Sequence, residues 1–336
     1  MSPRLKAFIQ YTLIVGVTVF LIWFSLRGLV VSNGENKLEY LKHTWNTANK
    51  SWLLAMAVIA MMSHLVRAER WRMLMKPAGY HPKFSNAFLS LMVGYLVNLV
   101  IPRGGEVSRC YNLFKLDKTP IETSFGTVVV ERIVDMICLL ALVAICFFVE
   151  ADKLFAFIDT LPFSSSNSSK FLLLIFLSIG GVMLFILGWW ILKKNKKLFE
   201  RVMQFWKGFK DGLLTIFQLK NKGLFIVYSL LIWFLYFVMS YTVMMAFSST
   251  SELGFHAVLS LFAIGSIAMA APLPGGTGAY HVLVPQGLVF LYSLPLSDAV
   301  AFTFIFHGWQ TFIVIVAGAV SLLITSYRVK KKSKVD

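Results

Sequence analysis

Two carboxylates, Glu131 and Asp135, stand inside an apolar run that is long enough to cross a membrane. They are four residues apart, so they share one face of a helix. An ionisable side chain at membrane depth is costly unless it is paired or wetted, which makes it a candidate for function. Two carboxylates on one face repel each other and need a cation or a proton. The predicted cations are Arg103 and Arg109, because Arg132 lies on a neighbouring face.

A second candidate is the stretch Pro102-Arg-Gly-Gly-Glu106, which interrupts an apolar region. A broken helix leaves backbone groups without partners, and at membrane depth these are tolerated only against protein or a water-filled cavity. Gly104 and Gly105 allow close approach to free amides, and Arg103 offers a donor fork that fits phosphate. An arginine beside free amides at a helix start is typical of an anion site. A plain turn between two short helices is the alternative interpretation.

A third candidate is the glycine-rich stretch that begins at Pro274 and ends at His281. Its amides are also predicted to cradle a phosphate. It is not a nucleotide loop, because no Lys-Ser/Thr follows it and no strand precedes it. His281 is a candidate proton carrier or head-group contact, with simple helix packing as the alternative. Arg67 and Arg70 close an earlier span, and we expect them to anchor it at the lipid head groups or to bind a head group. The residues of this third stretch are Pro274, Gly275, Gly276, Gly278, Tyr280 and His281.

The composition of the chain predicts an integral membrane protein. Of its 336 residues, 57% are apolar and only 14% are charged, whereas a soluble domain is about 45–50% apolar and about 25% charged. The net charge of +16 comes from cations between apolar runs, which follows the positive-inside bias and argues against nucleic acid. The three cysteines have no metal-ligand spacing, and we predict neither a metal nor another cofactor.

The elements that must position these residues are apolar runs of membrane length. Two further apolar regions, Phe84–Ile101 and Ala257–Leu294, are broken by Pro and Gly. The clear runs are Phe8–Val31, Ser51–Val66, Thr123–Val149, Phe171–Leu192, Leu224–Phe247 and Ala299–Ser326.

Charge in the connecting segments predicts the orientation of these runs. Segments 67–83, 193–222 and 328–336 are strongly basic and are placed in the cytoplasm, whereas 150–170 and 248–256 are slightly acidic. We therefore predict an all-α protein with six full spans, two re-entrant helical hairpins from opposite faces, and both termini cytoplasmic. Eight plain spans are the alternative. The two hairpins outline an inverted repeat, whose substrate site lies where broken helices meet.

The chain is predicted to form one polytopic domain over residues 1–336, with one helix on the membrane surface. Phe199–Leu219 alternates large apolar residues with cations, which is typical of an amphipathic interfacial helix on an anionic leaflet. A plain cytoplasmic connector is the alternative. Signatures of a zinc protease, a serine hydrolase or a nucleotide-binding loop are missing from the sequence, so we expect neither an enzyme nor an ATP-driven pump.

At these residues the sequence resembles the lysylphosphatidylglycerol synthase transmembrane-region family, also called the flippase-like domain family. The resemblance rests on Arg67-Ala-Glu-Arg-Trp-Arg72, on the stretch from Asn98 to Arg109, on Glu131-Arg-Ile-Val-Asp135, and on Pro272-Leu-Pro-Gly-Gly-Thr-Gly278. It implies a membrane domain that moves a lipid between leaflets of a prokaryotic plasma membrane. We expect no synthase domain here, and therefore no aminoacyl transfer.

The residues and the resemblance together predict a lipid translocase for a phosphate-bearing lipid, such as an anionic or aminoacylated phospholipid or a polyprenyl-phosphate carrier. Arg103 and Arg109 would bind the phosphate, with Glu131 and Asp135 balancing their charge or carrying a proton. Arg109→Ala or Glu131→Gln is then expected to stop transport without unfolding the protein. The alternatives are an intramembrane lipid-modifying enzyme and a non-catalytic partner that recruits a soluble synthase or glycosyltransferase. A second copy of the chain is a further candidate partner.

Overall fold

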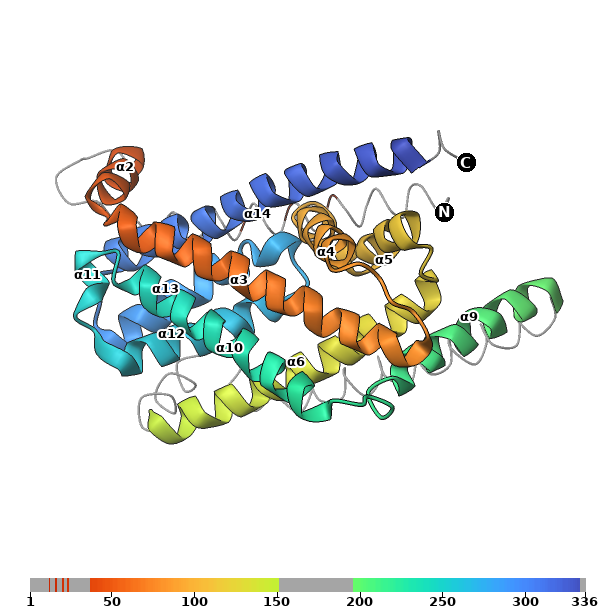
Figure 1. Ribbon diagram of the computed structural model, residues 1–336. Helices are drawn as coiled ribbons and strands as arrows, with labels where there is room; N and C mark the ends of the chain where they lie inside the picture. The colour runs from red at the N-terminus through yellow and green to blue at the C-terminus, as the bar shows by residue number, and fades with distance from the viewer. Residues whose placement is uncertain are drawn as a thin grey trace.

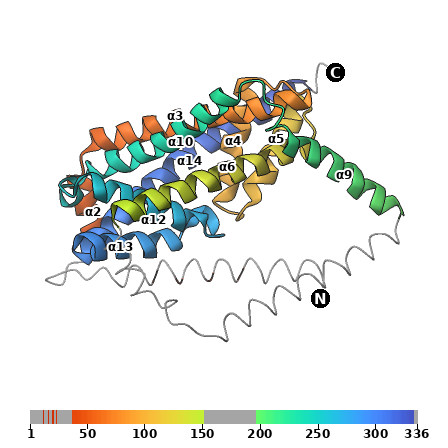
Figure 2. The ribbon, with the colours of Figure 1, turned by 90° about the horizontal axis from the view of Figure 1, so that it is seen from below.

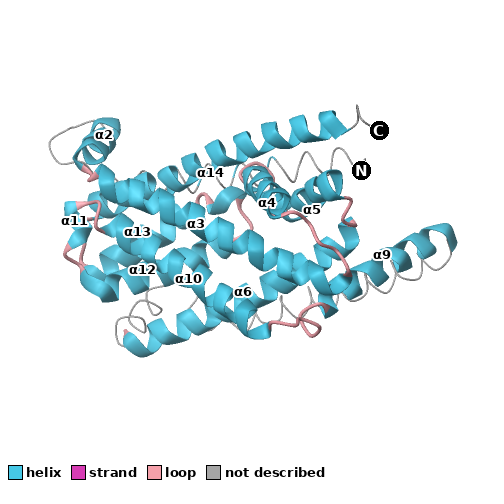
Figure 3. Cartoon of the chain, viewed as in Figure 1, coloured by secondary structure: helices cyan, strands magenta, loops and turns pink. Residues whose placement is uncertain are grey.

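The computed structural model describes residues 37–150 and 196–332, together with the single residues Thr12, Gly16, Phe20 and Trp23. Over these residues the chain forms helices joined by short loops, with no strand (Figure 3). The prediction of an all-α protein is thereby confirmed for the described part. The predicted span Phe171–Leu192, and all but four residues of Phe8–Val31, lie outside it.

Four helices are long and apolar enough to cross a membrane. The shortest of the four has 23 residues, which at 1.5 Å per residue is about 35 Å, against a hydrocarbon core of about 30 Å. This confirms a multi-pass membrane protein. The four are α3 (Lys50–Met75), α6 (Ile121–Val149), α10 (Lys222–Met244) and α14 (Leu296–Lys332).

Helix α3 runs nine residues past Val66, where the predicted span ended. The added turns carry Arg67 and Arg70, and both side chains are buried in the protein. Both side chains therefore point into the protein, and their contacts are not those of residues that anchor a span in lipid head groups. The physical reason is that both side chains find carboxylate partners inside the helix bundle, so the helix continues where hydropathy falls.

Helices α6 and α14 connect two ends of the molecule (Figure 1). At one end, the Arg328 Nη1 of α14 donates to Ser85 Oγ and Asn86 Oδ1 at 3.1 and 2.5 Å. We call this the basic end; it comprises residues 76–83, 115–121, 215–222 and 328–332. At the opposite end, Tyr292 donates to Glu150 Oε1 at 3.3 Å, and the short helices α2 (Lys37–Thr47) and α11 (Ser248–Ser251) lie at this end too (Figure 1).

The first broken region folds into α4 (Phe84–Asn98) and α5 (Gly104–Asp117), which pack against each other. Its two outer ends are tied together at the basic end, where the Lys83 N–H donates to Asp117 Oδ2 at 3.1 Å. Near the tip the helices cross so closely that a Cβ atom on Gly105 would lie 2.1 Å from the Gly94 carbonyl oxygen. The two helices therefore form a hairpin whose tip points into the molecule.

The second broken region forms α12 (Gly254–Ala270), the 3₁₀ turn η3 (Pro274–Gly276) and α13 (Ala279–Tyr292). Its outer ends meet at the opposite end, where Tyr292 Oη lies 2.8 Å from Ser260 Oγ, within hydrogen-bond distance. Its tip turns on Gly275, Gly276 and Gly278, all with positive φ. The two hairpin tips touch each other, because Arg103 Nη2 donates to the Ala270 carbonyl at 2.9 Å.

Helix α9 (Lys196–Leu214) leads away from the other helices (Figure 2). It is held against α6 at a close crossing, where a Cβ atom on Gly212 would lie 2.4 Å from the Thr123 carbonyl oxygen. The amphipathic helix predicted over 199–219 overlaps α9, which begins three residues earlier and gives way to turns at 215–218. The main apolar core lies elsewhere, among α3, α10 and α12 to α14.

Candidate functional site

A buried network of ion pairs lies where α3, α5 and α6 meet. The Arg70 side chain is fully buried, and its Nη2 lies 2.7 Å from Asp135 Oδ1 and 3.5 Å from Glu131 Oε1. The Arg109 Nη2 lies 2.6 Å from Glu131 Oε2. Each carboxylate therefore has at least one guanidinium at hydrogen-bond distance, as buried charges require.

Two further arginines extend the network toward an internal cavity. Arg67 donates to Asp135 through Nη2 and to Tyr236 Oη at 2.8 Å through Nη1. Arg132 Nη2 lies 2.7 Å from Glu106 Oε1, and the Arg132 side chain is 40% exposed. This outer pair is the most accessible part of the network.

Neutral side chains hold the inner guanidiniums in place. The Arg109 guanidinium lies over the Trp71 ring, 4.6 Å from its centroid, and Trp71 Nε1 donates to Thr127 Oγ1 at 3.0 Å. Ser229 Oγ of α10 accepts from Arg70 Nη1 at 3.2 Å. The inner arginines are thus fixed by four helices.

The sequence predicted only part of this pairing. Arg109 does pair with Glu131, but Arg103 lies at the hairpin tip and contacts Ala270 instead. Arg67 and Arg70 take the place assigned to Arg103. A signal was present, because Arg67 and Arg70 are three residues apart and share a helix face, as Glu131 and Asp135 do.

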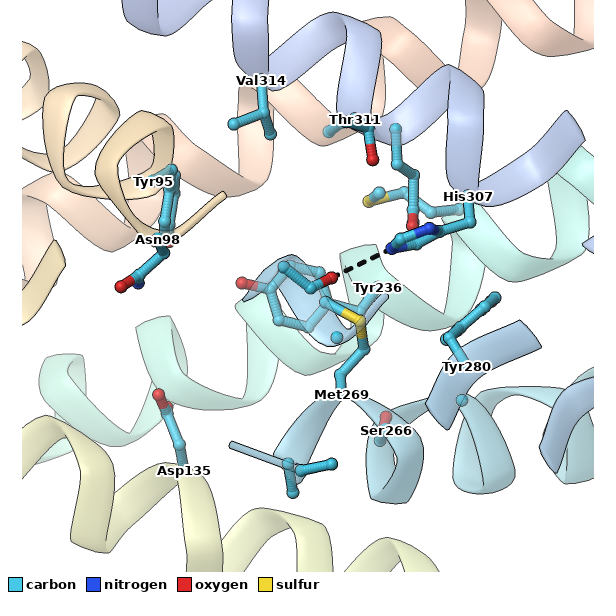
Figure 4. A pocket seen from close by; sticks show the side chains of 18 of the residues that line it. Tyr95, Asn98, Asp135, Tyr236, Ser266, Met269, Tyr280, His307, Thr311 and Val314 are labelled. Carbon is cyan, nitrogen blue, oxygen red and sulfur yellow. Dashed lines mark hydrogen bonds between the residues drawn. The ribbon is translucent and has the colours of Figure 1, made fainter. Parts of the chain in front are cut away.

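A cavity of about 480 Å³ opens beside the network, where the two hairpin tips meet (Figure 4). Helices α3, α4, α6, α10, α12 and α14 all contribute to its wall. Sequence reasoning did not select Tyr95 and Tyr236, which also line it. Of the predicted residues, Arg67, Asn98, Arg103, Glu106, Arg132, Asp135, Gly275, Gly276 and Tyr280 line it, whereas Arg70, Gly104, Gly105, Arg109, Glu131, Pro274, Gly278 and His281 do not.

The amides that were predicted to be free are already used within the chain. The Gly105 N–H donates to Asn98 Oδ1 at 2.7 Å, and the Gly104 N–H donates to the Ile101 carbonyl at 2.9 Å. The Gly276 N–H likewise donates to the Leu273 carbonyl at 3.1 Å. The prediction of amide cradles at these glycines is wrong for this conformation, because nearby acceptors satisfy them first.

The histidines near the second tip have defined roles in packing. His307 Nε2 lies 3.0 Å from the Gly275 carbonyl (Figure 4), and the His307 ring stacks on Tyr280 with centroids 5.1 Å apart. His281 Nδ1 accepts from the Gly278 N–H at 3.3 Å. His281 does not line the cavity. Both this and its contact with Gly278 fit the alternative interpretation, in which His281 serves helix packing.

The charge of the site is positive. Within the described residues, the four guanidiniums of the network face three carboxylates, those of Glu106, Glu131 and Asp135. Arg103 adds a further cation to the cavity wall. In the described part of the chain, buried atoms of five wall residues have no hydrogen-bond partner: His64 Nδ1, Arg67 Nε, Arg132 Nε, Glu106 Oε2 and Trp233 Nε1. The cavity thus offers donors and excess positive charge to a polar guest.

The chain matches the lysylphosphatidylglycerol synthase TM region over residues 9–318. It therefore belongs to that family of membrane domains, as its motifs had indicated.

Two relatives come from Methanocaldococcus jannaschii. The UPF0104 membrane protein MJ1595 is 33% identical over 90 residues, which cover 26% of this chain and 27% of that protein. The UPF0104 membrane protein MJ1078 is 26% identical over 249 residues, which cover 71% of this chain and 98% of that protein. No solved structure matches the chain.

Proposed function

We propose that the protein is a lipid translocase that moves a phosphate-bearing lipid between the leaflets of a prokaryotic plasma membrane. The observation that carries this proposal is the cationic cavity where two opposed hairpin tips meet. An anionic group in that cavity would neutralise the excess guanidinium charge. The family and the membrane-protein relatives support a lipid-related role in the membrane.

The proposed topology places both hairpins as re-entrant elements. Helix α4 has 15 residues and α12 has 17, so they extend about 22 and 26 Å, less than the hydrocarbon core of about 30 Å. Each hairpin has its two outer ends at one end of the molecule and its tip inside. With the two further spans that the sequence predicts at Phe8–Val31 and Phe171–Leu192, the proposal has six full spans and cytoplasmic termini.

In this proposal the head group enters the cavity and the acyl chains stay in lipid. The volume of about 480 Å³ lies within the range of about 300–1,000 Å³ that holds small molecules, and it leaves no room for two long chains. The phosphate would contact the guanidinium groups of Arg103, Arg132 and Arg67, which line the cavity. Neutral hydrogen-bonding groups such as Tyr236 would face the rest of the head group.

A reconstituted transport assay tests the proposal. The purified chain is placed in phosphatidylcholine vesicles that carry trace phosphatidylglycerol with a fluorophore on its acyl chain, and dithionite quenches the outer leaflet. With the wild-type protein, labelled lipid from the inner leaflet should reach the outer leaflet and be quenched. With Arg103→Gln/Arg132→Gln, the rate of this quenching should fall to that of protein-free vesicles. The control Lys118→Gln/Lys331→Gln removes the same charge outside the cavity and should transport normally. Wild-type rates from the Arg103→Gln/Arg132→Gln variant would contradict the proposal.

The same vesicles separate the alternatives. A lipid-modifying enzyme would give a covalent product by mass spectrometry, whereas a translocase leaves the lipid unchanged. A non-catalytic partner of a synthase would leave the labelled lipid in its original leaflet. Labelled glucosylceramide, which has a polar head without phosphate, tests whether the phosphate is what the site recognises.

A further inference from the structure

A second hollow lies at the basic end, separate from the central cavity. It has a volume of about 530 Å³ and is formed where the start of α4, the end of α5 and the end of α14 come together. Three cationic side chains line it, those of Lys83, Lys115 and Arg328, and one carboxylate, that of Asp117. None of its residues belongs to the central cavity.

The one carboxylate of this hollow is engaged by other groups. Asp117 Oδ1 accepts from Asn86 Nδ2 at 2.7 Å, and Oδ2 accepts from the Lys83 backbone N–H at 3.1 Å. Among the described residues, no carboxylate lies within 4.0 Å of the Lys83, Lys115 or Arg328 side-chain nitrogens. Three cations around a single carboxylate therefore leave the hollow with an excess of positive charge.

Two of the cations are held in position by neutral groups. The Arg328 Nη1 donates to Ser85 Oγ and Asn86 Oδ1, which fixes the guanidinium at the rim. The Lys115 ammonium lies over the Tyr111 ring, 4.5 Å from its centroid. These contacts position the charges without neutralising them, so the site is partly organised before a ligand arrives.

We propose that this hollow is a second binding site, for a phosphate group, at the basic end of the molecule. A phosphate carries enough negative charge and enough acceptor oxygens to engage two ammonium groups and a guanidinium at once. Basic pockets between membrane helices on the cytoplasmic side are typical binding places for phospholipid head groups. A soluble phosphate ester presents the same chemistry, and the experiment separates the two sources.

Equilibrium binding to the full chain in phosphatidylcholine nanodiscs tests this site. The Arg103→Gln/Arg132→Gln background removes two cations of the central cavity, so that the site of the proposed function does not contribute to the signal. The two probes are glycerol 3-phosphate in solution and dioctanoyl phosphatidic acid, each titrated calorimetrically. Lys83→Gln/Lys115→Gln should weaken binding about 30-fold, from two cations at the surface. Both lysines are exposed, so their loss leaves the packing intact.

The matched control is Lys118→Gln/Lys331→Gln, which removes two exposed cations at the same end but outside the hollow. It should bind as tightly as the background. Binding of both probes supports a phosphate site open to solution, and binding of phosphatidic acid alone supports a lipid head-group site. The proposal is overturned if neither probe binds, or if both pairs of substitutions weaken binding equally.

Discussion

At the scale of single residues, Arg70 and Arg72 differ in what surrounds them. Arg70 is fully buried and lies close to two carboxylates, whereas Arg72 is 24% exposed and, among the described residues, pairs with Glu69 alone. Removing one partner of a buried pair leaves an uncompensated charge in a medium of low polarity.

We therefore expect Arg70→Met to lower the free energy of unfolding by about 3–5 kcal/mol. Arg72→Met should cost less than about 1 kcal/mol, since a partly exposed pair is screened. Denaturant unfolding in micelles measures both. Equal losses from the two variants would contradict a buried network.

Arg109 and Glu131 are unsuitable positions for a test of transport alone. Arg109→Ala and Glu131→Gln were expected to stop transport without unfolding the protein, but both side chains are buried in mutual contact. Their loss should destabilise the fold, so Arg132 and Arg103 on the cavity wall are the cleaner probes of transport.

How far the sequence predicted the site follows from the range of each interaction. The shared face of Glu131 and Asp135 is a local property of a helix, and it was predicted. Their pairing with Arg67 and Arg70 joins residues more than 60 positions apart, and no local pattern specifies such a contact. The occupied amides at the first tip were missed for a different reason. Their acceptors are close in sequence, Asn98 Oδ1 for Gly105 and the Ile101 carbonyl for Gly104, but the conformation of the tip that brings them together is not fixed by helix periodicity.

At the scale of elements, the first hairpin depends on the close crossing of α4 and α5. A Cβ atom on Gly105 would lie 2.1 Å from a backbone oxygen, whereas nothing lies within 4 Å of one on Gly223. Gly105→Ala must push the two helices apart, which also moves Arg109.

We expect Gly105→Ala to lower the thermal unfolding midpoint in detergent and to abolish transport. Gly223→Ala, also in a helix, should leave both unchanged or raise stability slightly, since alanine is the better helix former. A Gly105→Ala protein with the wild-type midpoint would contradict the described crossing.

The docking of α9 on α6 gives a second test at this scale. Gly212→Ala would place a methyl group 2.4 Å from the Thr123 carbonyl oxygen, whereas the nearest atom to a methyl group on Gly208 is Glu122 Cβ at 3.0 Å, a conflict that a shift of a few tenths of an ångström relieves. Gly212→Ala should therefore separate α9 from α6, and Gly208→Ala should not. Limited proteolysis within residues 196–222 should become faster only in the Gly212→Ala variant. Equal cleavage rates for the two variants would contradict the close crossing of α9 and α6 at Gly212.

Element boundaries show where hydropathy stops being informative. The breaks at Pro102 and at Pro274 were predicted, because proline and glycine interrupt helices locally. The end of α3 was missed by nine residues and the end of α14 by six. In both cases the helix continues through charged residues, which hydropathy interprets as the end of a span.

At the scale of the whole molecule, the two ends differ in charge, and the proposed topology assigns the basic end to the cytoplasm. Lys331 lies at the basic end, and Glu252 lies in the loop after α11 at the other; both are exposed.

On a background without cysteines, Glu252→Cys should react with a membrane-impermeant maleimide in intact cells. Lys331→Cys should react only after the cells are opened, because it faces the cytoplasm. Labelling of Lys331→Cys but not Glu252→Cys in intact cells would mean that the basic end faces the outside, opposite to the proposed orientation. Reaction of both variants from outside would mean that an even number of spans separates the two positions. That result would contradict a re-entrant second hairpin followed by one full span, α14.

The order of the charges along the chain bears on how the protein is made. Arg67, Arg70 and Arg109 all precede their partners Glu131 and Asp135. During synthesis, α3 and the first hairpin therefore emerge from the ribosome with arginines that have no counter-ion until α6 follows. A lone arginine is costly in lipid, so these helices should wait at the translocon and enter the bilayer together with α6, as one unit of biogenesis.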